Sequence, residues 1–123
     1  MKIITIIGRT LLGLIFVVFG ANIFLNFLPM PPLAGMAGDF FKVMFASHYL
    51  NVVAVFEIIG GLILLSGRFT PLGLTLIGPV IVNILCFHIL MNPAGLPLAI
   101  IVSVLALFLL WRERSAFAGL LRQ

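Results

Sequence analysis

Glu57 is the residue whose type and position most clearly suggest chemistry, because it is an acid in the middle of a long apolar run. The run reads YLNVVAVFEIIGGLILLSG and otherwise suits a hydrocarbon environment. A carboxylate at membrane depth is costly unless it is protonated, paired or hydrated, so such acids usually have a function. No basic residue is expected at the same depth. We therefore expect a neutral carboxyl that donates a hydrogen bond to Asn22 or Asn83.

Other polar residues fall into two layers of the apolar runs. At a rise of about 1.5 Å per residue, Asn22, Glu57 and Asn83 lie roughly 9 to 12 Å from the outer surface. Asn26 and His88 lie closer to that surface. We interpret the two layers as a polar pocket that is open to the outer face. Its candidate ligand-binding residues are Glu57, Asn22, Asn83, Asn26 and His88.

The asparagines also have a purely structural interpretation, because interhelical amide hydrogen bonds hold membrane helices together. For Glu57 a function is favoured, since an amide would do the same structural work without the cost of ionisation. His88 and Asn83 are five residues apart and differ by about 140° around a helix, so they do not share a face. His88 is therefore also compatible with an interfacial position outside the pocket.

The sequence lacks the combinations of residues that metal and haem sites need. Glu57 and His88 together fall short of a standard metal shell, so no metal is expected. His48 lies in the outer interface and is a poor second ligand for a haem. Cys86 is the only cysteine, which excludes an internal disulfide and a two-cysteine redox relay. No catalytic residue can be named, and whether the chain is an enzyme stays open.

Composition indicates which elements must position these residues. Of the 123 residues 63% are hydrophobic and 8% charged, which is too apolar for a soluble domain of this size. A membrane-spanning helix needs roughly 20 apolar residues. The sequence thus predicts an all-α membrane protein, an antiparallel four-transmembrane-helix bundle that forms a single domain over residues 1–123. Its expected spans are residues 3–28, 49–66, 71–91 and 96–111. In the first span, Gly13 and Gly20 share a face and predict a groove for a close neighbour.

The positive charges indicate the orientation in the membrane. Six of the seven Lys and Arg residues lie at the N-terminus, in the connection between the second and third spans, or at the C-terminus. Four spans place these three segments on one face, and the positive-inside rule makes that face cytoplasmic. We therefore expect cytoplasmic N- and C-termini. The basic residues are not clustered as a nucleic-acid site would be, so no nucleic-acid partner is expected.

The long connection after the first span predicts an interfacial amphipathic helix over about residues 33–47. Gly35, Gly38, Asp39 and Lys42 fall on one stripe, and methionine and phenylalanine side chains occupy the other side. Such a helix lies at the membrane surface with its aromatic side chains toward the acyl chains. It is either a cap on the bundle or a gate for a lipid-soluble ligand.

Three segments together resemble the DoxX family of small bacterial membrane proteins. They read RTLLGLIFVVFGANIFLNFLPMPP, FEIIGGLILLSGRFTPLGL and PVIVNILCFHILMNPAGLPLA. The specific features are the arginine before LLGL, the Asn-x-Phe end of the first span and the block E-x-x-G-G-L-x-L-L-x-G-R. The family is named for a membrane subunit linked to archaeal thiosulfate:quinone oxidoreductase, and some bacterial relatives are associated with oxidative-stress or thiol-redox complexes. The resemblance implies a multi-pass protein of the bacterial inner membrane.

Two functions follow as alternatives. The first is a quinone-interacting or accessory subunit of a redox system, with quinone as its cofactor and a soluble or membrane oxidoreductase as its partner. Glu57 would then exchange a proton with the quinone or hydrogen-bond its carbonyl. The second is a non-enzymatic module: a membrane scaffold, a lipid-binding protein or a small carrier for an apolar solute. Four helices leave little room for a transport path unless the chain forms a homo-oligomer.

Overall fold

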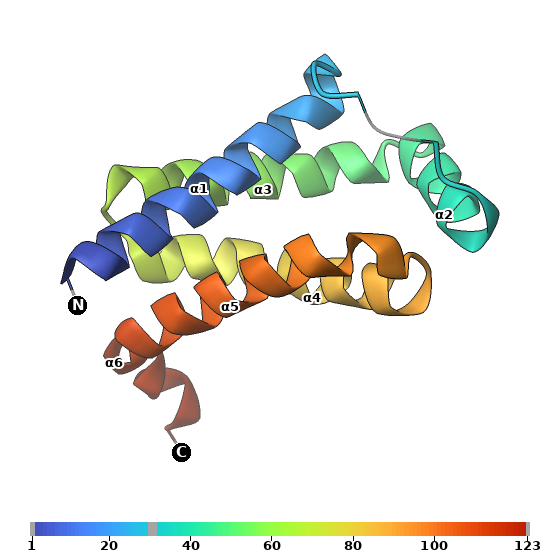
Figure 1. The fold of residues 1–123 in the computed structure, drawn as a ribbon. Coiled ribbons are helices and arrows are strands. Elements are labelled where there is room, and N and C mark those ends of the chain that lie inside the picture. The colour runs from blue at the N-terminus through green and yellow to red at the C-terminus, as the bar shows by residue number, and fades with distance from the viewer. Residues whose placement is uncertain (1, 30–31, 123) are drawn as a thin grey trace.

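The computed structural model describes residues 2–29 and 32–122, and within them the secondary structure is entirely helical (Figure 1). Four helices are long and apolar enough to cross a membrane, which confirms the predicted all-α membrane bundle. The long helices are α1 (Lys2–Leu25), α3 (Tyr49–Ser66), α4 (Thr70–Leu90) and α5 (Leu96–Arg112). The shorter elements are α2 (Gly35–Ala46), η1 (Pro93–Gly95), α6 (Arg114–Phe117) and η2 (Ala118–Leu121).

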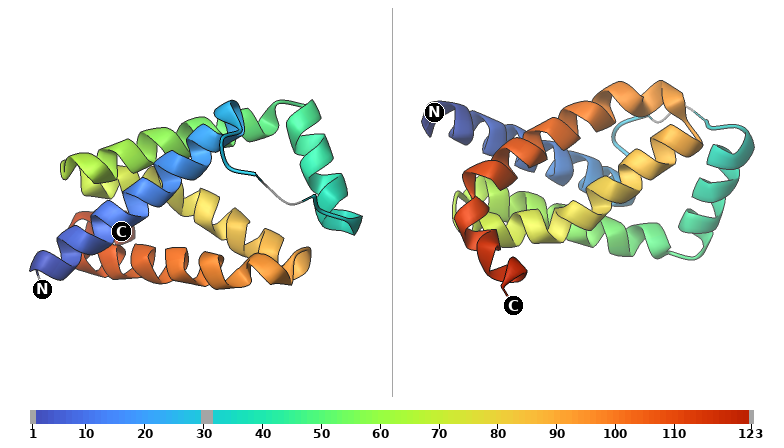
Figure 2. Two further views of the ribbon diagram at one scale, coloured as in Figure 1. Left: turned by 45° about the horizontal axis from the view of Figure 1, so that its top comes forward. Right: turned by 90° about the horizontal axis from the view of Figure 1, so that it is seen from below.

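The long helices pack side by side in an antiparallel ring. Helix α1 contacts α3, α3 contacts α4, α4 contacts α5, and α5 returns to α1. Both chain ends and the turn between α3 and α4 lie at one end of the bundle, which we call the termini end (Figure 1). Helix α2 and the turn between α4 and α5 lie at the other end, which we call the α2 end (Figure 2). There α2 runs across the bundle rather than along it.

The backbones of α1 and α3 approach each other closely at two glycines. A Cβ atom added to Gly13 would lie 2.8 Å from the carbonyl oxygen of Gly61, and one added to Gly61 would lie 2.7 Å from that of Gly13. Further along α1, Gly20 packs against Ala54 and Glu57. Helix α3 thus occupies the groove that the glycines of the first span predict. Membrane helices commonly use small residues in this way, because they let backbones approach and gain van der Waals contact.

Arg9 joins the same two helices at the termini end. Its Nη1 donates a hydrogen bond of 2.6 Å to the carbonyl oxygen of Leu64 in the last turn of α3. That turn ends at Gly67, which has a φ of 75° and adopts the left-handed conformation typical of helix ends. A cation is favourable here because the last carbonyls of a helix carry partial negative charge. From the sequence, Arg9 was a marker of membrane orientation and part of the family resemblance, and no contact was predicted for it.

The spanning helices differ little from the predicted runs except at the end of the first. Helix α1 stops at Leu25, whereas the apolar run continues to residue 28. The break coincides with Asn26, whose φ of 50° is in the left-handed region. Helix α2 begins two residues later than the predicted amphipathic segment and ends one residue earlier.

Candidate functional site

Glu57 lies on the face of α3 that packs against α1. A Cβ atom added to Gly20 would be 3.1 Å from the Cβ of Glu57, so the glycine makes room for the acid. The side chain is half-buried. Within residues 2–29 and 32–122 its carboxyl has no hydrogen bond and no ion pair. The expected hydrogen bonds from Glu57 to Asn22 or Asn83 are therefore absent, and both amides have other partners.

Asn22 closes the turn that follows α1. The N–H of Leu28 donates to its Oδ1 at 2.8 Å, and its Nδ2 donates to the carbonyl oxygen of Leu28 at 3.3 Å. Asn22 is only 2% exposed, whereas Leu28 is 38% exposed, so the two bonds join a buried amide to the surface of the turn. The amide of Asn22 thus folds the chain back after Leu25 and fixes the position of Leu28.

Asn83 is turned toward its own helix rather than toward Glu57. Its Nδ2 donates a hydrogen bond of 2.8 Å to the carbonyl oxygen of Pro79, one turn earlier in α4. The residue is exposed on the surface of the bundle. Polar side chains in spanning helices often satisfy themselves in this way when no neighbouring helix offers a partner.

His88 belongs to the turn between α4 and α5. Its Nδ1 lies 3.1 Å from the carbonyl oxygen of Asn92, and its ring packs directly on Gly95. The edge of the Phe87 ring completes its surroundings, with 5.1 Å between the ring centroids. These contacts hold the two helices together at the α2 end.

Asn26 is the candidate residue that lines a cavity at the α2 end. This cavity has a volume of about 390 Å³ and lies between the loop after α1 and helix α2. We call it the α2 pocket. Asn26 and Leu28 border it on the loop side, and Phe41 and Phe45 border it on the helix side. Because Asn22 holds Leu28 by both backbone groups, it shapes the wall of the α2 pocket without lining it.

Aromatic contacts fix helix α2 over the pocket. Phe41 packs edge-on against Phe87 of α4 with 4.9 Å between centroids, and Phe45 lies 6.1 Å from Phe41. Phe40 also contacts Phe87, at 5.5 Å, but it does not line the pocket. The aromatic side of α2 that the sequence predicted is thus directed partly into the bundle.

The chemistry available in the α2 pocket is recognition rather than catalysis. It combines aromatic rings, apolar side chains and the amide of Asn26, and none of its lining residues is titratable. Small-molecule pockets typically have this composition, with a few polar groups that orient a largely apolar ligand. Across the described part of the chain, no group of three or more His, Cys, Asp or Glu side chains is placed to hold a metal ion.

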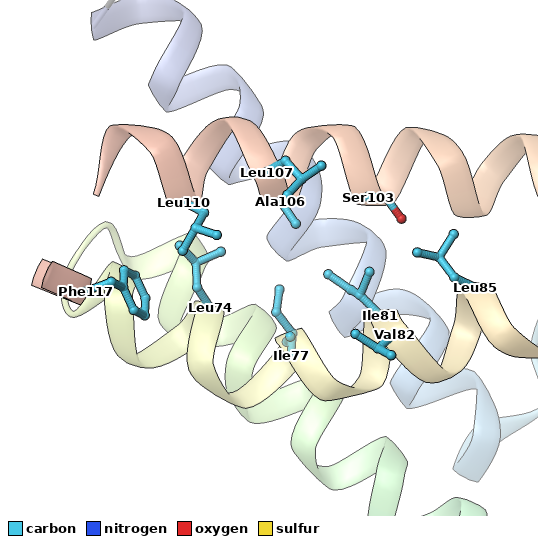
Figure 3. Close-up of a pocket in the computed structure, with 11 residues that line it drawn as sticks. Leu74, Ile77, Ile81, Val82, Leu85, Ser103, Ala106, Leu107, Leu110 and Phe117 are labelled. Carbon is cyan, nitrogen blue, oxygen red and sulfur yellow. The ribbon is translucent and has the colours of Figure 1, made fainter. Parts of the chain in front are cut away.

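A second cavity, which we call the α4–α5 groove, lies between those two helices (Figure 3). It has a volume of about 350 Å³ and is lined by α4 from Leu74 to Leu85 and by α5 from Ser103 to Leu110. Phe117 closes it at the termini end. Ser103 is the one polar side chain among its lining residues, and its hydroxyl donates to the Ala99 carbonyl at 2.7 Å. The groove therefore presents an apolar surface.

The DoxX family model matches residues 4–89, which cover α1 to α4 and include all five candidate residues. The chain belongs to the DoxX family. DoxX membership and the four apolar helices together make it a multi-pass membrane protein. A curated relative, the Bacillus subtilis (strain 168) protein described as "Uncharacterized protein YwoB", is 32% identical over 98 residues. That match covers 76% of this chain and 64% of the relative. No solved structure matches the chain.

Proposed function

We propose that this DoxX protein is an accessory membrane subunit of a redox system and binds a quinone ring in the α2 pocket. The observation that carries the proposal is the composition of that pocket, whose lining includes one asparagine and two phenylalanines among otherwise apolar residues. A flat, uncharged ring with carbonyl groups matches these features. A volume of about 390 Å³ is within the usual range for small-molecule sites, roughly 300 to 1,000 Å³.

Each side of the pocket has a different task in this proposal. The amide of Asn26 donates a hydrogen bond to a ring carbonyl and so sets the orientation of the ring. Phe41 and Phe45 provide aromatic contact. Leu28 supplies apolar contact from the opposite side, in the position that Asn22 enforces. Bound there, a quinone would supply two-electron redox chemistry, and an oxidoreductase partner would exchange electrons with it.

Glu57 is a candidate for proton exchange rather than for direct contact with the ring. It does not line the α2 pocket, and its carboxyl has no partner among the described residues. If it exchanges protons with the bound ring, Glu57→Gln should weaken binding of a quinone analogue or abolish its pH dependence. Unchanged binding at every pH would exclude proton exchange between Glu57 and the bound ring.

The proposal is tested by quinone binding to the purified protein in lipid nanodiscs. Phe41→Ala should weaken the binding of a short-chain quinone about tenfold, the equivalent of one aromatic contact worth about 1.4 kcal/mol. Phe40→Ala is the matched control. It removes the same ring from the adjacent position and also loses a contact with Phe87, but it leaves the pocket lining intact. Equal effects of the two variants, or no binding by the unmodified protein, would refute the proposal.

We also propose that the protein lies in the bacterial inner membrane with both termini in the cytoplasm. Six of the seven basic residues belong to elements at the termini end, whereas Lys42 belongs to α2. The positive-inside rule then places the termini end in the cytoplasm and opens the α2 pocket to the outer face. A fluorescent reporter fused to the C-terminus that matures only inside the cell tests this orientation. If the fusion protein is produced but the reporter is not fluorescent, the C-terminus lies outside the cytoplasm and the proposed orientation is wrong.

A non-enzymatic module is the second candidate function: a scaffold, a lipid-binding protein or a small carrier, working alone or as a homo-oligomer. The α4–α5 groove supports this alternative, because its lining is suited to an apolar chain rather than to a reacting group. Native mass spectrometry separates the two candidates. A stable complex with an oxidoreductase supports the redox subunit, and lipid-bound protein without any such partner supports the module.

A further inference from the structure

The α4–α5 groove has the length of one acyl chain within one membrane leaflet. On α4 it runs from Leu74 to Leu85, which is about 16 Å at about 1.5 Å per residue. Half of a hydrocarbon core of about 30 Å is about 15 Å. The groove begins about one turn after the start of α4 at the termini end, so it extends from that leaflet toward the middle of the membrane.

Small residues are among those that line the groove, and Figure 3 labels two of them, Ser103 and Ala106 of α5. A Cβ atom added to Gly78 would meet nothing within 4 Å, so α5 does not fill this part of the α4 surface. On the facing side, Ser103 and Ala106 are the smallest lining residues of α5. A space of this kind between two spanning helices is in contact with lipid, and an apolar chain that fills it gains dispersion contacts with both helices.

Basic residues follow the groove-lining part of α5 in the sequence, at the termini end of the bundle. Leu110 lines the groove, and Arg112 and Arg114 follow it by two and four residues. Arg114 lies over the ring of Trp111 at 4.9 Å, and its Nη1 donates to the Trp111 carbonyl at 2.8 Å. Both arginines are exposed, and a guanidinium has five N–H donors, so Arg114 retains donors for a further ligand. Glu113 is the one acid in the segments at this end, against six basic residues.

We propose that the α4–α5 groove binds one acyl chain of an anionic phospholipid, whose phosphate lies against Arg112 and Arg114. Basic pockets between membrane helices on the cytoplasmic side bind such head groups, and the orientation proposed above puts the termini end on that side. Phe117 lines the groove at the termini end, next to the place where the acyl chain would join its head group. The site lies at the opposite end of the bundle from the α2 pocket and does not depend on whether a quinone binds there.

The test is lipid retention measured by native mass spectrometry after reconstitution in nanodiscs of phosphatidylcholine with a minority of phosphatidylglycerol. The unmodified protein should retain phosphatidylglycerol in preference to phosphatidylcholine. The double variant Arg112→Gln and Arg114→Gln should bind phosphatidylglycerol roughly 25-fold more weakly, at about fivefold for each basic residue near the membrane surface. The control Lys2→Gln with Arg122→Gln removes the same charge from the same end and should change binding far less.

A second pair of variants tests the groove itself. Ala106→Phe fills it and should displace the retained lipid. The control Val104→Phe places the same ring on α5 at a position that is 58% exposed and does not line the groove. Thermal unfolding of each variant shows whether it is folded, and a folded Ala106→Phe protein that retains as much lipid as its control overturns the proposal. Equal retention of both lipids by the unmodified protein overturns it as well. The proposal also fails if the unmodified protein is a dimer and Ala106→Phe dissociates it, because a second copy of the chain would then fill the groove.

Discussion

Replacing Asn22 with alanine should destabilise the bundle far more than the same change at Asn83. Asn22 makes two hydrogen bonds with the backbone of Leu28, at 2.8 and 3.3 Å, and its side chain is 2% exposed. Each such bond contributes about 0.5 to 1.5 kcal/mol, and its loss also leaves a backbone group of Leu28 without its partner. We therefore expect Asn22→Ala to lower the free energy of unfolding by about 2 kcal/mol.

Asn83→Ala provides the matched control. It removes one hydrogen bond that Asn83 makes within its own helix on the exposed surface, so the free energy of unfolding should change by less than about 0.5 kcal/mol. Equilibrium unfolding in mixed detergent micelles, followed by circular dichroism and by the fluorescence of the single tryptophan, measures both variants. Because Leu28 lines the α2 pocket, Asn22→Ala should weaken quinone binding too, under conditions where the variant is still folded. Equal destabilisation by the two alanine variants would show that the Asn22 side chain does not hold the turn.

The same unfolding assay can measure the effects of four further substitutions. Gly61→Ala should destabilise the protein by about 1 to 3 kcal/mol because the new Cβ would lie 2.7 Å from a backbone oxygen of α1, whereas Gly78→Ala, with open space around it, should be neutral or stabilising. Arg9→Gln should lower stability by about 1 to 3 kcal/mol through loss of the charged hydrogen bond to the carbonyl of Leu64, and a neutral result would mean that water replaces the guanidinium. Glu57→Leu should raise stability, since an unpartnered acid among apolar helices is unfavourable, and a decrease would reveal a partner for the carboxyl.

The sequence was sufficient to predict the fold because hydropathy alone determines where a membrane chain can be helical. Each apolar run became a spanning helix, and the glycine face of the first run met α3 as its spacing indicated. The end of α1 was less predictable. Residues 26–28 are apolar enough to continue a helix, but Asn26 leaves the helical conformation and Asn22 bonds to Leu28. The hydropathy of the run cannot predict a turn that depends on the hydrogen bonds of one side-chain amide.

The candidate site was harder to predict, because depth in the membrane does not determine which partner an amide finds. Counting residues placed Asn22, Glu57 and Asn83 in one layer, but each asparagine bonds to nearby backbone in its own part of the chain. His88 similarly contacts the carbonyl of Asn92. Local backbone acceptors lie close to the side chain whatever the packing of the bundle, so they compete well against a distant carboxyl.

The α2 pocket could be anticipated only in part. The spacing of phenylalanines along residues 33–47 indicated an amphipathic helix with an aromatic face. Phe41 and Phe45 of this helix do line the α2 pocket. The opposite wall, formed by Asn26 and Leu28, depends on how an irregular loop folds back. Helical periodicity carries no information about such a loop.

The four spanning helices are packed unequally: α1 and α3 are in close backbone contact, whereas α4 and α5 leave a groove between them. Where the backbones of α1 and α3 meet at Gly13 and Gly61, neither helix can move closer, and tight packing resists compression. Across the ring, the α4–α5 groove leaves room for those two helices to approach or separate. A change in the lateral pressure or thickness of the bilayer should therefore mainly alter the distance between α4 and α5 at the α4–α5 groove. The α1–α3 pair, which carries Glu57, would then keep its geometry while the surrounding membrane changes.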